Sequence, residues 1–186
     1  MANSTKKIVT PVFRASFVNV LKPRLNEQSG KEEYSIKMIF DKDADLSPLA
    51  EIVQEAIKNK WGNNPPKGLK LPVKDGNESD LDKYPEDKDK WVANAKTVLT
   101  QPGIVNRQLE PITDPKEIYS GCYMRASLTA YAYDNKSKGV SFGLQNLIKW
   151  EDGEPLSSKA TAEEDFKEFR EASAVSQTDA ASILGI

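Results

Sequence analysis

Two stretches near the N-terminus show the two-residue alternation of apolar and polar side chains that is typical of β-strands. Residues 12–21 alternate loosely, with Phe13 on one side and Arg14 on the other. Residues 34–40 alternate again, and the polar stretch 26–31 between the two segments favours a turn. The pattern therefore predicts an antiparallel hairpin.

A helical repeat follows, because apolar residues recur at spacings of three and four between residues 46 and 61. Ser47 is placed to cap the helix, Pro48 suits its first position, and Gly62 follows its end. We predict one long helix whose apolar stripe packs on the core.

Residues 62–90 form a long segment rich in Pro, Gly, Asn and Asp, which predicts a loop. A loop of this length inside a compact domain is usually either functional or mobile. Its second half, residues 75–90, holds seven acidic and three basic side chains. This acidic half could lie over a basic groove.

Three more strands follow the loop. Residues 91–99 predict the first, residues 123–133 show the clearest alternation in the chain, and residues 140–150 return after the turn 134–139. In the last segment the residues expected to alternate toward one side are Val140, Phe142, Leu144 and Ile148. The chain thus predicts five strands, the last two forming a hairpin.

One side of residues 123–133 carries aromatic, cationic and hydroxyl side chains. They are Tyr123, Arg125, Ser127, Thr129, Tyr131 and Tyr133. Flat rings stack on unpaired bases at about 1–3 kcal/mol per base, and cations neutralise phosphates. Tyrosine also fits a β-surface well, so the same side could instead cover a second layer or a C-terminal helix.

Further cations fall on or beside the predicted strands. With Arg125 they are Arg14, Lys37, Lys96 and Arg107. Each alone is more often a solvated surface charge, but in a closed barrel they could line one groove.

The C-terminal part of the chain is acidic. Residues 151–186 hold nine acidic and three basic side chains, whereas the preceding residues hold 19 and 23. Thr161 and Glu164 have capping-box spacing and predict a last helix that carries Phe166 and Phe169, before a small-residue tail. A basic body with an acidic end is one indication of a protein that binds polyanions, although a solvated charged surface explains the charge alone equally well.

Composition excludes several kinds of chemistry. The 186 residues contain no histidine and one cysteine, Cys122, which rules out histidine-based triads, His-built zinc sites and an internal disulfide. Asp75, Asn77, Ser79 and Glu86 match part of a calcium-loop spacing, but Asp80 stands where that loop needs glycine. We expect no enzymatic activity, no metal and no cofactor.

The chain also lacks the apolar length that a membrane span needs, and residues 1–10 do not have the apolar run of a signal peptide. We therefore expect no membrane partner and a cytoplasmic location.

Taken in order, several motifs resemble those of tailed-phage and prophage single-stranded DNA-binding proteins. The resemblance spans about residues 12–169, and its most distinctive parts are Ile-Tyr-Ser-Gly-Cys-Tyr at 118–123 and Tyr-Ala-Tyr-Asp at 131–134. Supporting blocks lie at residues 14–20, 31–35, 71–76, 93–96, 106–107, 143–146, 152–156 and 162–166.

This resemblance implies an OB-fold, a five-stranded Greek-key barrel that binds single-stranded DNA with little sequence preference during phage replication, recombination or repair. It also implies an acidic tail that competes for the DNA groove or recruits replication proteins. The usual OB-fold helix lies between the third and fourth strands, whereas the predicted helix follows the second. Either there is a further strand near residues 69–74 that the alternation does not reveal, or the barrel differs from the usual OB-fold.

We therefore predict a flexible N-terminus (1–10), an OB-fold domain (11–156) with a long helix and an inserted loop, and an acidic C-terminal helix and tail (157–186). Bases would stack on Tyr123, Tyr131 and Tyr133, and phosphates would meet Arg14, Lys37, Lys96, Arg107 and Arg125. The expected partners are single-stranded DNA, replication proteins and further copies of the chain, in the cytoplasm of a bacterial host. The alternative is a protein-interaction module of a phage replication complex that uses the sheet face and the acidic tail.

Overall fold

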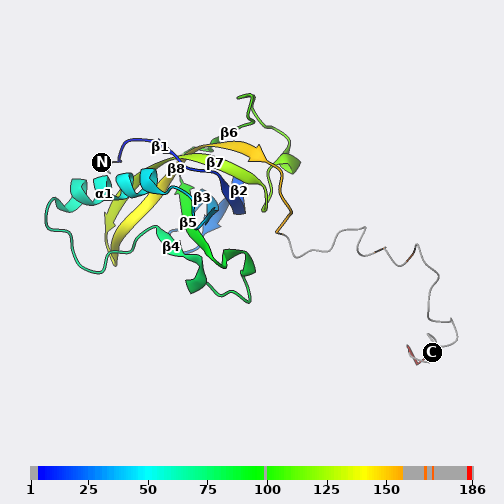
Figure 1. Cartoon of the computed structure of the whole chain (residues 1–186), viewed down its shortest axis with the longest axis horizontal. Helices are drawn as coiled ribbons and strands as arrows, with labels where there is room; N and C mark the ends of the chain where they lie inside the picture. The colour runs from blue at the N-terminus through cyan, green and yellow to red at the C-terminus, as the bar shows by residue number, and fades with distance from the viewer. Residues whose placement is uncertain (1–3, 99, 157–165, 167–168, 170–183, 186) are drawn as a thin grey trace. The chain divides into compact units, whose positions relative to one another are not determined.

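The computed structural model describes residues 4–98, 100–156, 166, 169, 184 and 185. The chain divides into two units, residues 1–156 and 157–186. The first unit is mainly β-structure with one α-helix (Figure 1). None of the helices in the described residues is both long and apolar enough to cross a membrane.

Five long strands close into a barrel. They are β2 (Phe13–Asn26), β3 (Lys31–Asp41), β5 (Lys90–Thr97), β7 (Tyr123–Asp134) and β8 (Lys138–Glu151). Their order is β2-β3-β5-β8-β7, and β7 pairs back onto β2. All these pairs are antiparallel except β5 with β8, which is parallel. The closed five-stranded arrangement confirms the predicted OB-fold.

Three short strands extend the sheet where the sequence predicted none. β1 (Ile8–Val9) pairs with β7, β4 (Val73–Asp75) with β5, and β6 (Gly103–Val105) with β8. Strands of two or three residues are too short to show an alternation. β4 lies at the place where the resemblance left room for a further strand.

Residues 5–10, within the segment 1–10 that the sequence predicted to be flexible, are hydrogen-bonded along β7. Thr5 and Thr10 are buried, and their hydroxyls accept hydrogen bonds from the backbone N–H groups of Ala130 and Ala126 at 2.9 and 3.1 Å. The backbone N–H groups of both threonines donate in turn to the carbonyls of the same two alanines. Residues 5–10 thereby extend the pairing of β1 with β7.

The helix α1 (Ser47–Trp61) follows β3, the second strand of the barrel, as the apolar repeat predicted. It buries Leu49, Ile52 and Ala56, and it packs against β1, β7 and β8. The prediction that Ser47 caps this helix is wrong, because Leu46 stands at the cap position and no side chain caps it. The barrel therefore carries its helix one connection earlier than the usual OB-fold.

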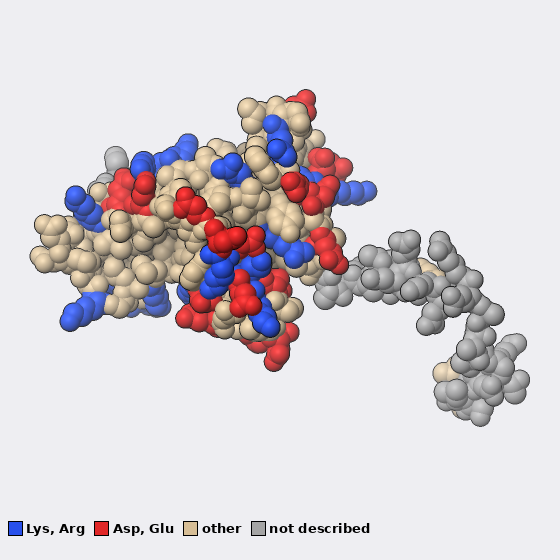
Figure 2. Space-filling model, viewed as in Figure 1, with Lys and Arg blue, Asp and Glu red and all other residues tan. Residues whose placement is uncertain are grey.

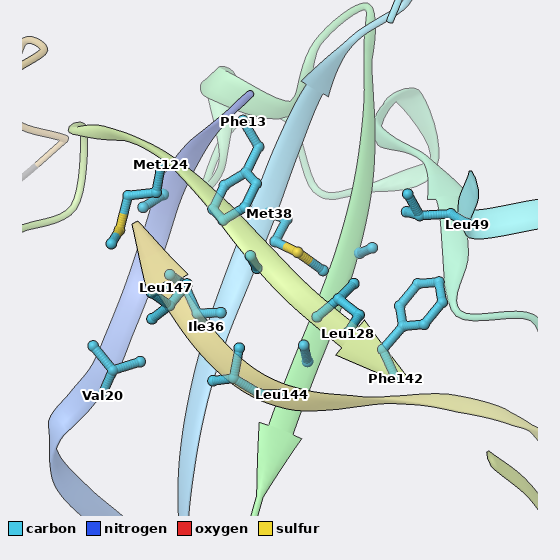
Figure 3. Close-up of a cluster of buried hydrophobic side chains, with 14 of the residues drawn as sticks. Phe13, Val20, Ile36, Met38, Leu49, Met124, Leu128, Phe142, Leu144 and Leu147 are labelled. Carbon is cyan, nitrogen blue, oxygen red and sulfur yellow. The ribbon is translucent and has the colours of Figure 1, made fainter. Parts of the chain in front are cut away.

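The core lies inside the barrel, where the inner faces of the strands meet α1 (Figure 3). The inner side of β7 is buried as its alternation predicted, through Met124, Ala126, Leu128 and Ala130. The alternation in β8 changes side, because the pairing register shifts between Ser127 and Leu128. The residues that β8 buries beyond this shift are therefore of the other parity: Leu147 is buried, and Ile148 is only half-buried.

Cys122 gives a test of this core. Its side chain is fully buried, and burial raises the pKa of its thiol. Because only the thiolate attacks alkylating reagents, the native chain should react with iodoacetamide orders of magnitude more slowly than the urea-unfolded chain. Labelling followed by mass spectrometry measures both rates, and equal rates would contradict the burial of Cys122.

The second unit is described at four residues. The rings of Phe166 and Phe169 lie edge to face with centroids 6.0 Å apart, and both side chains are exposed, as is that of Leu184. The start of the predicted helix at Thr161 and most of the tail fall outside the described residues.

Candidate nucleic-acid interface

The outer side of β7 carries the row of side chains that the sequence singled out. Tyr123 is 36% exposed, and Tyr131 and Tyr133 are half-buried, so none of the three rings is sealed inside the barrel. Arg125, Ser127 and Thr129 are half-buried on the same side. The row therefore lies on the surface of the barrel.

Glycines in β8 make room for this row. Gly139 pairs with Tyr133, and a Cβ atom built on Gly139 would lie 2.4 Å from the Lys70 carbonyl oxygen and 2.6 Å from the Tyr133 hydroxyl. Gly143 pairs with Thr129, and its Cβ would lie 2.7 Å from the Thr129 Oγ1. All three distances are shorter than van der Waals contact, so larger residues in β8 would push these side chains aside.

Trp150, near the end of β8, forms the centre of a cationic cluster. The Arg107 guanidinium carbon lies 4.2 Å from the Trp150 ring centroid, and that of Arg125 lies 5.3 Å from it. Arg125 is oriented by its Nε, which donates to the Thr10 carbonyl at 2.9 Å. We call Arg107, Arg125 and Trp150 the Trp150 platform, since it presents two planar cations beside one large ring.

An apolar groove of about 300 Å³ adjoins this platform. Its lining includes Val9 from β1, Leu109 from the loop after β6, and Ile148 and Trp150 from β8. Val9 and Leu109 are 52% and 71% exposed, so the groove presents apolar surface to the solvent. The groove thus combines exposed apolar surface with the guanidinium of Arg125, a combination that suits a base and its phosphate.

Arg14 lies at the border of the β7 face, because it is paired in register with Tyr123. Its Nη2 donates to the Glu154 carbonyl at 2.5 Å and its Nε to the Gly121 carbonyl at 3.3 Å. These bonds hold the half-buried guanidinium between β2 and the segment after β8.

That segment is itself held by a small polar cluster. The Tyr119 hydroxyl donates to Asp152 at 2.8 Å and accepts from the Gly153 N–H at 3.1 Å, while Lys149 pairs with Asp152 at 2.7 Å. The hydrogen bonds from Lys149 and Tyr119 lower the pKa of Asp152. Asp152 and Lys149 therefore stay charged at neutral pH, while burial raises the pKa of Tyr119 and keeps its hydroxyl protonated. The cluster holds the backbone at Gly153, next to the Glu154 carbonyl that accepts from Arg14.

Lys96 and Lys37 lie on the outer face of β2, β3 and β5. Lys96 borders the β7 row, because it is in register with Gly143 of β8, which is in register with Thr129. Lys96 is 43% exposed in its side chain and lies 3.5 Å from Glu33. Lys37 is buried in an ion pair, whereas a residue that binds phosphate was expected to be an exposed cation. Its ammonium is 2.7 Å from both carboxylate oxygens of Asp87, and the two residues are only 8% and 1% exposed.

The structure therefore brings Arg107 and Arg125 together, places Arg14 at the edge of the same face, and leaves Lys96 and Lys37 on the adjoining strands β5 and β3. Trp150 was not predicted as a site residue, because the alternation assigned Ile148, and with it Trp150, to the inner side of β8. The sequence contains both members of the contact, the planar side chains of Arg107 and Trp150. Neither has a neighbouring residue in the sequence that indicates that the two side chains meet.

In the acidic segment 75–90, the first carboxylate has a structural role. Asp75 accepts the backbone N–H of Asn77 at 2.9 Å and pairs with Lys42 at 2.9 Å, and these two interactions lower its pKa. Within the part of the chain that the structure describes, no three Cys, Asp or Glu side chains are grouped so as to hold a metal ion.

Comparison with known proteins agrees with this architecture. Residues 6–177 match the family model described as "Enterobacter phage Enc34, ssDNA-binding protein". Protein p50 of Acyrthosiphon pisum secondary endosymbiont phage 1 is 25% identical over 170 residues, covering 84% of this chain and 89% of that protein.

Two solved structures are similar in fold. The single-stranded DNA-binding protein of bacteriophage Enc34, solved in complex with single-stranded DNA, matches with a TM-score of 0.68 and 27% identity over 81% of this chain and 89% of that chain. The bacteriophage T7 single-stranded DNA-binding protein gp2.5 matches with a TM-score of 0.62 over 92% and 96%, and its 14% identity shows the fold alone. With a family model that spans nearly the whole chain, the protein belongs to the Enc34 phage single-stranded DNA-binding protein family.

Proposed function

We propose that this protein binds single-stranded DNA, with little preference for sequence, along the outer face of β7 and the Trp150 platform. The observation that carries the proposal is the convergence of a tyrosine row and two guanidinium groups on one exposed side of an OB-barrel. Membership of a family named for single-stranded DNA binding supports it, as does the related Enc34 protein, solved with single-stranded DNA.

Each group has a defined role in this proposal. Tyr123, Tyr131 and Tyr133 stack on bases, because every base offers a flat face and stacking tolerates any sequence. Arg107 and Arg125 meet phosphates beside Trp150, and Arg14 extends the cationic surface at the border with β2. Lys96 contacts the strand where it crosses to the β2–β3–β5 face, whereas Lys37 serves to hold Asp87.

In the phage-infected cell this activity would cover and protect single strands during DNA replication, recombination or repair, in the host cytoplasm. The protein would act as a coat and not as an enzyme.

A titration of fluorescein-labelled oligo-dT, followed by anisotropy, tests the proposal. We expect tight binding at low salt, weaker binding of a duplex of equal length, and an oligonucleotide that stays intact when Mg²⁺ is added. Four phosphate contacts would make log K fall with log salt at a slope of about −3, at roughly −0.7 per contact. Equal affinity for the duplex would overturn the assignment.

A protein-interaction module is the second candidate, and the exposed side chains of Val9 and Leu109 in the groove favour it. Exposed apolar surface of this kind is typical of partner-binding sites. Charge reversal at Lys96, which does not line the groove, separates the two, since it should weaken DNA binding and leave a replication-protein complex intact.

The acidic C-terminal segment gives a further prediction. If residues 157–186 compete with DNA for the cationic surface, a chain that ends at Leu156 should bind oligo-dT several-fold more tightly than the full chain, because the competing carboxylates are removed. The difference should shrink as salt is raised, since salt screens the competition. Unchanged affinity in 50 mM salt would contradict the competing role.

A further inference from the structure

An apolar groove of about 420 Å³ lies along α1, on a part of the first unit that the proposed function does not use. Its lining includes Ala50, Val53 and Ile57 from α1, Leu71 from the segment that leads into β4, and Trp91 near the start of β5. Ala50 is exposed and Leu71 is 49% exposed, so the groove is open to the solvent. It shares no lining residue with the groove beside the Trp150 platform.

The charged side chains of α1 divide between two sides of the helix. Glu51 pairs with the Lys6 ammonium at 2.9 Å, and Glu55 accepts the backbone N–H of Lys6 at 3.2 Å, so both acids face the N-terminal segment. Gln54 lines the groove, and the exposed Lys58 follows it by one turn on the same side of the helix. The acids of α1 are therefore directed away from the groove.

Cations border the groove. The Lys42 Nζ lies 3.6 Å from the ring centroid of Trp91 and pairs with Asp75 at 2.9 Å. Lys70 and Lys74 are exposed and stand just before and just after the lining residues at the start of β4. In Figure 2 the surface between α1 and the segment that leads to β4 is mostly uncharged, with Lys and Arg side chains along its lower edge. The groove therefore suits an apolar segment with acidic flanks.

A segment with these properties lies in the second unit of the chain. Phe166 and Phe169 are 62% and 84% exposed, and their rings lie edge to face, so they present two large apolar groups side by side. Residues 163–171 around them hold five acidic and two basic side chains. Neighbouring exposed rings of this kind are typical anchors of a protein interface, because their burial removes much apolar surface from water.

The length of the chain indicates that a second copy supplies this segment. The groove lies beside the start of β8, because Lys70, next to the lining residue Leu71, forms a β-bridge with Gly139. Leu156 follows the other end of β8, whose 14 residues extend over about 40 Å at ~3.3 Å per residue. The ten residues from Leu156 to Phe166 span about 35 Å at most. This connection is too short to pass around the barrel to the groove of its own chain.

We propose that the groove along α1 binds the Phe166–Phe169 segment of a second copy of the chain. The two rings lie on the apolar lining, and the acidic flanks lie beside Lys58, Lys70 and Lys74. Groove and segment belong to different parts of the molecule, so the contact is head-to-tail and can repeat from copy to copy. The association does not depend on the proposed DNA binding, but it would place successive copies next to one another on a DNA strand.

Sedimentation velocity of the full chain, without DNA and over a hundredfold range of concentration, tests the association. We expect the weight-average sedimentation coefficient to rise with concentration. The double variant Phe166→Ser with Phe169→Ser should stay monomeric, because it removes the apolar surface that the contact buries. Leu184→Ser, at another exposed apolar residue of the second unit, is the matched control and should associate like the unaltered chain.

A variant of the groove tests the other partner of the contact. Ala50→Glu places a bulky acid in the groove, where it would repel the acidic flanks, and should weaken the association at least about tenfold. Asn59→Glu, at an exposed position of α1 outside the lining, adds the same charge and should change the association no more than about twofold. Glutamate suits a helix at both positions, and circular dichroism shows whether each variant folds.

Mixing the two defective chains tests the head-to-tail arrangement. Ala50→Glu keeps the Phe166–Phe169 segment, and the double serine variant keeps the groove, so an equimolar mixture should form a one-to-one pair although neither chain associates alone. A mixture that stays monomeric would refute the arrangement.

Other results would overturn the inference as a whole. They are an unaltered chain that stays monomeric at every concentration, a double serine variant that associates unchanged, and a Leu184→Ser variant that loses association to the same extent as the double serine variant. The oligo-dT titration decides the proposed function separately, since the sedimentation experiment contains no DNA.

Discussion

Replacing Arg107 and Arg125 together by glutamate is expected to weaken oligo-dT binding by about 100-fold or more at low salt. Both guanidinium groups flank Trp150, and a charged hydrogen bond to a phosphate contributes about 1.5–3 kcal/mol. Loss of two phosphate contacts should also make the slope of log K against log salt shallower by about 1.4. Anisotropy titrations at several salt concentrations measure both effects.

A matched control is the pair Lys60→Glu and Lys67→Glu, which makes the same change in net charge. Lys60 lies in the last turn of α1 and Lys67 in the loop after it; both are exposed, and this end of the molecule is far from β6 in Figure 1. We expect a loss of only a few-fold from the weaker overall field. If both double variants lost affinity equally, net charge and not the Trp150 platform would govern binding.

The second large effect concerns stability. Asp87→Ala leaves the Lys37 ammonium, only 8% exposed, without its carboxylate beneath Phe17 and Tyr84. Breaking a buried ion pair from one side costs about 3–5 kcal/mol, because an uncompensated charge stays in a poorly solvated place. Urea unfolding monitored by circular dichroism should show a loss of this size in the free energy of unfolding.

Two further variants make this measurement specific. The pair Lys6 and Glu51 is of similar length, 2.9 Å, but its side chains are 57% and 61% exposed, so Glu51→Ala should lower the free energy of unfolding far less. The double variant Lys37→Met with Asp87→Leu removes both charges and should recover most of the lost stability. An Asp87→Ala loss as small as that of Glu51→Ala would show that the buried pair does not hold the loop that carries Asp87.

Much of the barrel is predictable from the sequence because its long strands have one buried and one exposed side. In β7 small and large apolar residues alternate with tyrosines and hydroxyls over twelve residues, and both the strand and its outward side follow from that pattern. The helix is equally clear, since its apolar repeat covers four turns. β1, β4 and β6 are too short for any such signal.

The candidate site is less predictable, because it depends on contacts between distant segments. Lys37 does alternate to the outer side of β3, but its partner Asp87 comes from a loop fifty residues further on. Trp150 reaches Arg125 because the register shift in β8 changes which residues face outward. Phe17 has the same parity as the buried Phe13 and Ala15, and the bulge in β2 turns it to the surface.

The account depends most on the claim that bases stack on the outer face of β7. Fluorine NMR of the protein labelled with 3-fluorotyrosine tests this claim directly, because the chain has only six tyrosines and single Tyr→Phe variants assign their signals. On addition of oligo-dT, the account predicts that the resonances of Tyr123, Tyr131 and Tyr133 shift, while that of Tyr119, whose hydroxyl is bound to Asp152 and Gly153, stays in place. Saturating binding that leaves those three resonances unmoved would contradict it.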